Sequence, residues 1–102
     1  MSERHEGTFT IAMDHPSLPG HFPGSPVVPG VVVLDSVMRQ FEAWRGDGAR
    51  VTGLKQAKFH APLLPGERAD VRLERDGESL SFRVTRDEQL VAQGTFTLAV
   101  LP

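Results

Sequence analysis

Two side chains and one pair of backbone amides have the types and spacing needed for proton-transfer chemistry. His21 lies in a Gly-His-Phe-Pro-Gly turn, and an imidazole titrates near about pH 6.5, which suits proton abstraction around neutrality. Gly30 and Val31 stand where a helix is predicted to begin, so their amides lack helical partners and can stabilise an oxyanion. Asp35 is a lone carboxylate after a run of valines and a leucine. Dehydration of a 3-hydroxyacyl thioester needs these parts: a base, oxyanion donors and an acid.

The same residues also fit a structural interpretation. A single loop histidine is usually a solvated or structural residue, and His5 and His60 are predicted to lie on the surface. Asp35 precedes Arg39 by four positions, which is the spacing of an ordinary ion pair on a helix surface. The residues alone therefore make the pair of His21 and Asp35 a hypothesis and leave the surface ion pair open.

A long loop and one helix must position these groups. Residues 8–13 alternate apolar and polar side chains, which predicts a half-buried strand. Five prolines and three glycines between His15 and Gly30 exclude regular structure there. Residues 31–45 contain neither glycine nor proline, and their apolar side chains recur at the spacing of one helix face: Val31, Leu34, Val37, Met38, Phe41 and Trp44.

The rest of the chain has the pattern of an antiparallel sheet. Residues 51–63 are predicted to be extended, with Leu54, Ala57 and Phe59 directed inward. Later segments alternate in the same way, and Asp76-Gly77 is a hairpin signal. A strand, a loop, a helix and four strands predict one α+β domain over residues 1–102. A hotdog arrangement, in which an antiparallel sheet of about five strands wraps around one central helix, fits this pattern, and other α+β folds fit the strand pattern as well.

Composition and charge narrow the function classes. A net charge of −2 argues against a nucleic-acid partner, and the lack of cysteine excludes disulfides and a thiol nucleophile. The first ten residues lack the apolar core of a secretion signal, and the apolar run 31–34 is far shorter than the about 20 residues that span a bilayer. We expect a cytoplasmic protein with no membrane partner, and a reaction that requires no metal or organic cofactor.

One segment resembles a known enzyme family. The sequence HFPGSPVVPGV from His21 to Val31, followed by Leu34-Asp35, resembles the signature of the (3R)-hydroxyacyl-acyl-carrier-protein dehydratases. In that family the histidine and an acidic residue fourteen positions later form the active site, and Asp35 stands fourteen positions after His21. The stretches 58–67 and 90–94 also resemble family blocks, so the likeness covers residues 8–100. The short chain resembles the compact dehydratases of specialised pathways, such as aryl-polyene clusters.

The resemblance implies a function and a set of site residues. A hotdog homodimer would convert a (3R)-3-hydroxyacyl group on acyl carrier protein to the trans-2-enoyl thioester, in fatty-acid or polyene-type biosynthesis. His21 of one subunit would face Asp35 of the other. The amide of Gly30, with Val31 beside it, would hold the oxyanion, and Phe22 and Val28 would line the acyl tunnel.

One departure from the family keeps two other functions open. Arg39 stands where these dehydratases commonly have glutamine, and an arginine beside Asp35 favours the carboxylate form over the acid. A hotdog acyl thioesterase could use Asp35 to activate water and would not need His21. A non-catalytic acyl-binding hotdog subunit would need neither side chain.

Overall fold

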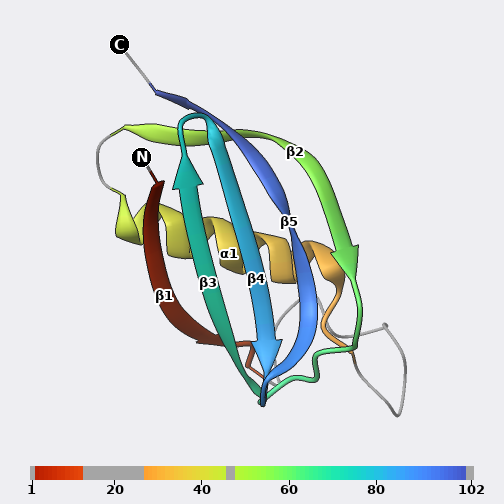
Figure 1. Ribbon diagram of the computed structural model, residues 1–102. Helices are drawn as coiled ribbons and strands as arrows, with labels where there is room; N and C mark the ends of the chain where they lie inside the picture. Colours follow the sequence, from red (N-terminus) through yellow and green to blue (C-terminus); the bar gives the residue numbers. More distant parts are fainter. Residues whose placement is uncertain (1, 13–26, 46–47, 101–102) are drawn as a thin grey trace.

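A five-stranded antiparallel sheet and one helix make up the described part of the chain. The computed structural model describes residues 2–12, 27–45 and 48–100, and the helix lies against one face of the curved sheet (Figure 1). In chain order the elements are β1 (Ser2–Thr10), α1 (Gly30–Trp44), β2 (Ala49–Phe59), β3 (Arg68–Asp76), β4 (Ser79–Arg86) and β5 (Gln89–Val100).

The strand order across the sheet is β1-β3-β4-β5-β2, with every neighbouring pair antiparallel. The core forms between α1 and the inner face of the sheet, where Val37 and Phe41 of the helix are fully buried. Every second residue of the three central strands joins them: Ala69, Val71, Leu73, Leu80, Phe82, Val84, Ala92, Phe96 and Leu98. The predicted fold class and the predicted alternation along these strands are therefore confirmed, except that Leu90, which the alternation places inward, is only partly buried. Within residues 2–12, 27–45 and 48–100, no helix is both long and apolar enough to cross a membrane.

The helix begins at Gly30, where it was predicted to begin, but part of its predicted buried face was wrong. It runs from Gly30 to Trp44, and Val32 and Val33 are buried. Val31, predicted to face the core, is 71% exposed. Three consecutive residues of a helix point in three different directions. The spacing alone therefore cannot decide which of the three valines faces outward.

Strand β1 begins earlier than predicted and ends at Thr10 rather than at residue 13. Its polar first half carries no apolar alternation, yet Ser2 to Thr10 pair with β3 residue by residue. Two ion pairs link the strands on the outer face, Arg4 with Glu74 and Glu6 with Arg72. Backbone pairing with a neighbouring strand thus includes residues whose side chains gave no strand signal.

Two residues of strand β2 that were predicted to lie in the core are exposed. The strand ends at Phe59, and Leu54 and Phe59 are 48% and 50% exposed. Its pairing with β5 shifts twice, between Val51 and Gly53 and between Leu54 and Gln56. Each irregularity breaks the two-residue alternation of side chains. The inward-facing residues of this edge strand therefore cannot be deduced from the sequence by alternation. Ala57 alone of the predicted set packs against the core.

Two tight turns join the three central strands. Gly77 and Glu78 form the first, one residue later than the Asp76-Gly77 signal indicated, and Gly77 has a φ of 61°. Asp87 and Glu88 form the second, with φ angles of 48° and 68°. Two successive positive φ angles are typical of a type I′ hairpin turn, in which glycine is strongly preferred. Glutamate at this position is strained, whereas aspartate tolerates the left-handed region better.

Replacing Glu88 with glycine is expected to raise the free energy of unfolding by about 0.5–1 kcal/mol, because glycine has no Cβ penalty at positive φ. Urea unfolding monitored by circular dichroism measures this change. Gly77→Ala is the matched control: no atom lies within 4 Å of an added Cβ there, so only backbone strain acts and stability should fall by about 1 kcal/mol. A loss of stability in Glu88→Gly would contradict the prediction.

Candidate functional site

An apolar pocket lies between the segment that leads into α1 and the segment that follows β2. Figure 1 shows the start of α1 beside the end of β2. The pocket has a volume of about 430 Å³ and is lined by Val27, Val28, Pro29, Gly30, Val33, Phe59, His60, Ala61, Pro62, Leu63 and Val91. Two backbone hydrogen bonds of 2.8 Å fix its walls: Val28 N–H donates to the Leu63 carbonyl, and His60 N–H donates to the Val91 carbonyl.

The first helical amides border this pocket without a protein partner. Pro29 is the N-cap residue and makes no side-chain cap. The amides of Val32 and Val33 both donate to the Pro29 carbonyl, at 3.0 and 3.2 Å. The amides of Gly30 and Val31 have no hydrogen-bond partner among the described residues, and the helix dipole adds positive potential at this end. They could therefore hold a developing oxyanion, and this role stays a prediction.

Gly30 lies in close contact with the ring of Phe59. A Cβ added there would lie 2.8 Å from Cζ of Phe59, so this half-exposed ring would have to shift. The absence of a side chain lets the aromatic ring pack against the start of the helix. Gly30 therefore supplies both an amide and the space for Phe59, and it lines the pocket with Val28, which is 4% exposed.

Asp35 lies one turn further along α1, outside this pocket. Its side chain is 52% exposed and accepts a 2.8 Å hydrogen bond from Nε of Arg39. This hydrogen bond and the carboxylate charge raise the pKa of the Arg39 guanidinium above its usual value. The predicted surface ion pair is therefore present. Asp35 is not one of the residues that line the pocket, so the described part of one chain does not bring it together with Gly30.

Two predicted site residues, His21 and Phe22, lie outside the described residues. The geometry between His21 and Asp35 therefore stays a prediction. The structure adds one residue that the sequence analysis did not single out: His60 is exposed, as expected, but also lines the pocket. Its only sequence signal is its place after the last residue of β2, in the stretch Phe59-His60-Ala61-Pro62.

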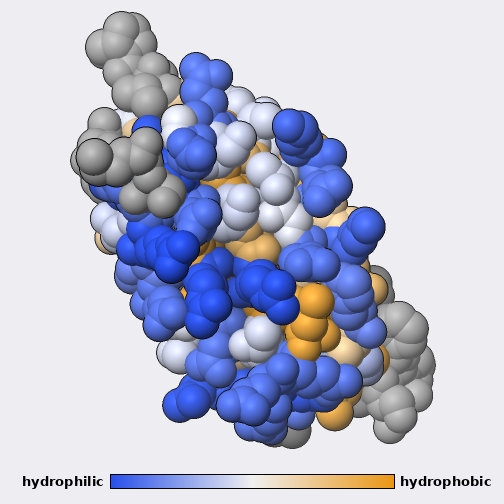
Figure 2. Space-filling model, viewed as in Figure 1, coloured by the Kyte–Doolittle hydropathy of each residue, from blue (hydrophilic) through white to orange (hydrophobic). Residues whose placement is uncertain are grey.

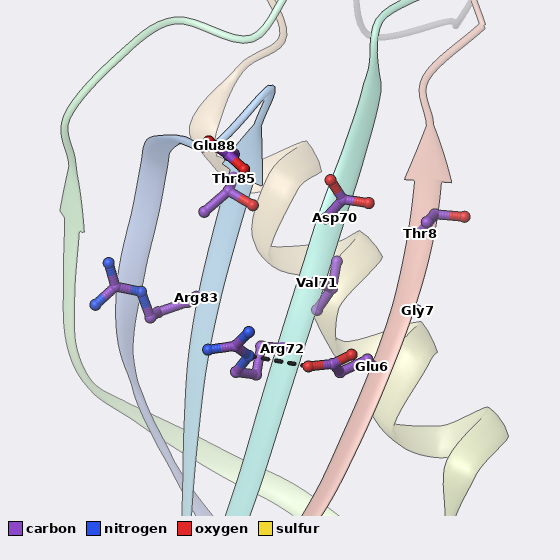
Figure 3. Close-up of a pocket in the computed structure, with 9 residues that line it drawn as sticks. All are labelled: Glu6, Gly7, Thr8, Asp70, Val71, Arg72, Arg83, Thr85 and Glu88. Carbon is purple, nitrogen blue, oxygen red and sulfur yellow. Dashed lines mark hydrogen bonds and ion pairs between the residues drawn. The ribbon is translucent and has the colours of Figure 1, made fainter.

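A second hollow lies on the outer face of the sheet, away from the helix. Figure 2 shows that most of this face is hydrophilic. The hollow has a volume of about 620 Å³, and the side chains around it come from β1, β3, β4 and the Asp87-Glu88 turn (Figure 3). Three acidic and two basic side chains are among the residues that line it: Glu6, Gly7, Thr8, Asp70, Val71, Arg72, Arg83, Thr85 and Glu88. Unlike the pocket at the helix start, it is lined mainly by charged and polar side chains. No group of three His, Asp or Glu in the described ranges could hold a metal ion.

Comparison with known proteins gives the family. A family model described as ApeI-like, ApeI dehydratase, matches residues 1–95. The chain belongs to the ApeI-like dehydratase family. It is 30% identical over 102 residues to a 3-hydroxyacyl-acyl-carrier-protein dehydratase, FabZ, of Polynucleobacter necessarius, covering 88% of this chain and 68% of that relative. Other FabZ dehydratases that match are longer, and the chain spans 48% of one and 59% of another.

Solved structures agree with the hotdog fold. The dehydratase heterocomplex ApeI:P from Xenorhabdus doucetiae matches with a TM-score of 0.83 and 25% identity, over 97% of this chain and 94% of that chain. The fluoroacetyl-CoA thioesterase FlK matches with a TM-score of 0.66 and 20% identity, over 99% of this chain and 87% of that chain. The second likeness is one of fold alone. This ApeI-like chain is therefore a hotdog protein of a hydroxyacyl dehydratase family.

Proposed function

We propose that this chain dehydrates a (3R)-3-hydroxyacyl thioester on acyl carrier protein to the trans-2-enoyl thioester. The observation that carries the proposal is the pair of unpartnered amides, Gly30 and Val31, beside an apolar pocket in a chain of a dehydratase family. The amides would hold the thioester oxygen as negative charge develops on it, while the pocket receives the acyl chain.

Each step of the reaction has a residue assigned to it. His21 removes the α-proton, and the electron pair of that C–H bond forms the enolate-like intermediate at the thioester. The pair then closes the C2–C3 double bond as the C3–oxygen bond breaks. Asp35, in its protonated form, gives its proton to the departing hydroxyl, which leaves as water. Phe22 and Val28 would line the path of the acyl chain, and no cofactor enters the balance.

A homodimer would complete the site. Asp35 lies outside the pocket of its own chain, and it is exposed, so a partner subunit could approach it. The side of the molecule that carries α1 and β2 also exposes large apolar groups: Val31, Leu54 and Phe59. β2 is a free edge of the sheet within the described residues, and an exposed edge strand with apolar side chains is a template for pairing. Asp35 of one chain would then form the catalytic pair with His21 of the partner chain.

The biological setting follows from the same proposal. The carrier is acyl carrier protein, as the names of the FabZ relatives state for those proteins, and the enzyme would work in the cytoplasm in fatty-acid or polyene-type synthesis. The structure of the Xenorhabdus relative is a heterocomplex. A chain of different sequence is therefore an alternative partner, and a monomer mass of the purified chain in light scattering would favour it.

The test is conversion of 3-hydroxyacyl-acyl carrier protein by the native chain and by His21→Ala, followed by mass spectrometry. We expect enoyl product from the native chain and a loss of at least about 100-fold in the variant, the usual contribution of a general base. Free acid released by both proteins would show a thioesterase instead. No reaction with any chain length, together with acyl binding, would show a non-catalytic acyl-binding subunit.

A further inference from the structure

The segment 60–67 connects β2 to β3, and its first half forms part of the apolar pocket. It contains neither helix nor strand, and Figure 1 shows it running beside the turn between β4 and β5. A connection of this kind lacks the ladder hydrogen bonds that hold a strand in place, so it opens easily unless other contacts fix it. The contacts of this segment therefore decide how firmly the pocket wall is held.

Arg86, the last residue of β4, holds the segment at both ends. Its Nη1 donates a 2.8 Å hydrogen bond to the Pro62 carbonyl and a 3.0 Å hydrogen bond to Oε1 of Glu67. Its Nη2 donates to Oε1 of Gln89, the first residue of β5, at 2.7 Å. The same oxygen of Glu67 also accepts the amide of Leu64 at 2.8 Å. One guanidinium thus ties the connection to the end of the β4–β5 hairpin.

The pair of Arg86 and Glu67 is better shielded from water than an ordinary surface ion pair. The two side chains are 19% and 32% exposed, whereas those of Arg4 and Glu74 are 75% and 43% exposed. Exposed pairs contribute little, because water and salt screen them. A shielded guanidinium that binds a carboxylate and a carbonyl together fixes their geometry more strongly.

The position of this segment also affects the other wall of the pocket. The carbonyl of Leu63, which is 2% exposed, accepts the amide of Val28 at 2.8 Å. Val28 belongs to the segment that leads into α1, and Leu63 directly follows the residue that Arg86 holds. Arg86 therefore fixes the spacing between the two walls. An apolar pocket with fixed walls favours a chain that fills it and rejects a longer homologue.

We propose that Arg86 and Glu67 are positioning residues that limit the length of the acyl chain that the pocket accepts. This inference rests on the proposed function, because that function places an acyl chain in the pocket. Neither residue lines the pocket. Both act through the connection 60–67, which moves away from the helix start when the pair is broken and leaves room for additional carbons.

The experiment measures how binding depends on acyl length, with 3-hydroxyacyl methylamides that differ by two carbons. In the native chain, affinity should rise with length up to a limit and then fall by about 10-fold or more for the next homologue. Arg86→Met keeps a long side chain but removes the guanidinium, and the same fall should shrink to less than about 3-fold. Isothermal titration calorimetry measures the affinities. A merely structural role would reduce the number of folded binding sites and leave the ratio of two affinities unchanged.

Arg4→Met is the matched control, because it breaks an ion pair with Glu74 away from the pocket. It should keep the native length limit. Glu67→Gln removes the ion pair but keeps an acceptor for the Leu64 amide, so it should act like Arg86→Met with a smaller effect. It decides the question if circular dichroism shows that Arg86→Met does not fold.

An unchanged length limit in the deciding variant would overturn the role of the pair, and so would a native chain without any length limit. A native chain that shows the limit but forms no enoyl product from 3-hydroxyacyl-acyl carrier protein would overturn the proposed function and leave the role of the pair standing. Failure of the native chain to bind any of the methylamides would overturn both.

Discussion

Replacing Asp35 with asparagine is expected to slow dehydration by at least about 100-fold while the fold stays intact, because the amide cannot give a proton to the departing hydroxyl. The side chain is half exposed and its one described partner is Arg39, so the substitution removes no core packing. Mass spectrometry of the acyl carrier protein measures the rate, and circular dichroism measures the fold. Near-normal turnover would remove Asp35 from the catalytic pair.

Two control variants separate the acid from the ion pair. Glu42 is an exposed carboxylate on the same helix, seven positions after Asp35, and Glu42→Gln should leave turnover unchanged. Arg39→Gln breaks the pair with Asp35 but keeps the carboxyl group. If Arg39→Gln lost as much activity as Asp35→Asn, the ion pair rather than the proton of Asp35 would be the important feature.

A mixed dimer tests whether the site is shared between subunits. Coexpression of the His21→Ala and Asp35→Asn chains should restore about one quarter of native activity, because half of randomly formed dimers are mixed and each mixed dimer has one complete site. No recovery is expected if each site uses His21 and Asp35 of one chain. Light scattering at micromolar concentration should give the mass of a dimer, and a monomer mass would contradict the shared site.

Most of the fold could be predicted because the three central strands are buried on one face only. Their alternation of apolar and polar residues follows the two-residue period of a strand, as in Ala69, Val71 and Leu73. The two edge strands of the sheet were predicted less accurately. The first half of β1 is polar and is a strand because it pairs with β3, while irregular pairing with β5 changes which residues of β2 face inward. Both effects depend on neighbouring strands that local sequence does not reveal.

The candidate site was predicted in its parts but not in its assembly. A proline followed by glycine at a helix start indicates free amides, and the structure places Gly30 on an apolar pocket. The spacing of Asp35 and Arg39 predicted the ion pair, which is present, while the role of Asp35 as an acid was predicted from its spacing to His21. Neither spacing shows which subunit's site the carboxylate belongs to. His60 was missed because its pocket forms only when the segment after β2 folds against the helix start.

Gly94→Ala is expected to lower the free energy of unfolding by about 3 kcal/mol, the upper range for overpacking a core, and the melting temperature by more than about 10 °C. Gly94 is buried on the inner face of β5. A Cβ there would lie 2.2 Å from the Gln56 carbonyl oxygen and 2.8 Å from the ring of Phe82. The carbonyl belongs to the backbone of β2, and Phe82 stacks on Phe96 with ring centroids 5.1 Å apart. Neither can move without disturbing the sheet or the core.

Gly53→Ala provides the matched comparison, because Gly53 of β2 pairs with Thr97 of β5 in the same ladder in which Gly94 of β5 pairs with Ala57 of β2. Its added Cβ would meet only Oγ1 of Thr97, at 2.9 Å, and a hydroxyl can rotate away. We therefore expect Gly53→Ala to cost less than about 1 kcal/mol in the same urea or thermal measurement. Equal losses in the two variants would mean that β5 and β2 separate easily at Gly94. In that case the pocket wall held by Val91 of β5 would be a movable element rather than a fixed one.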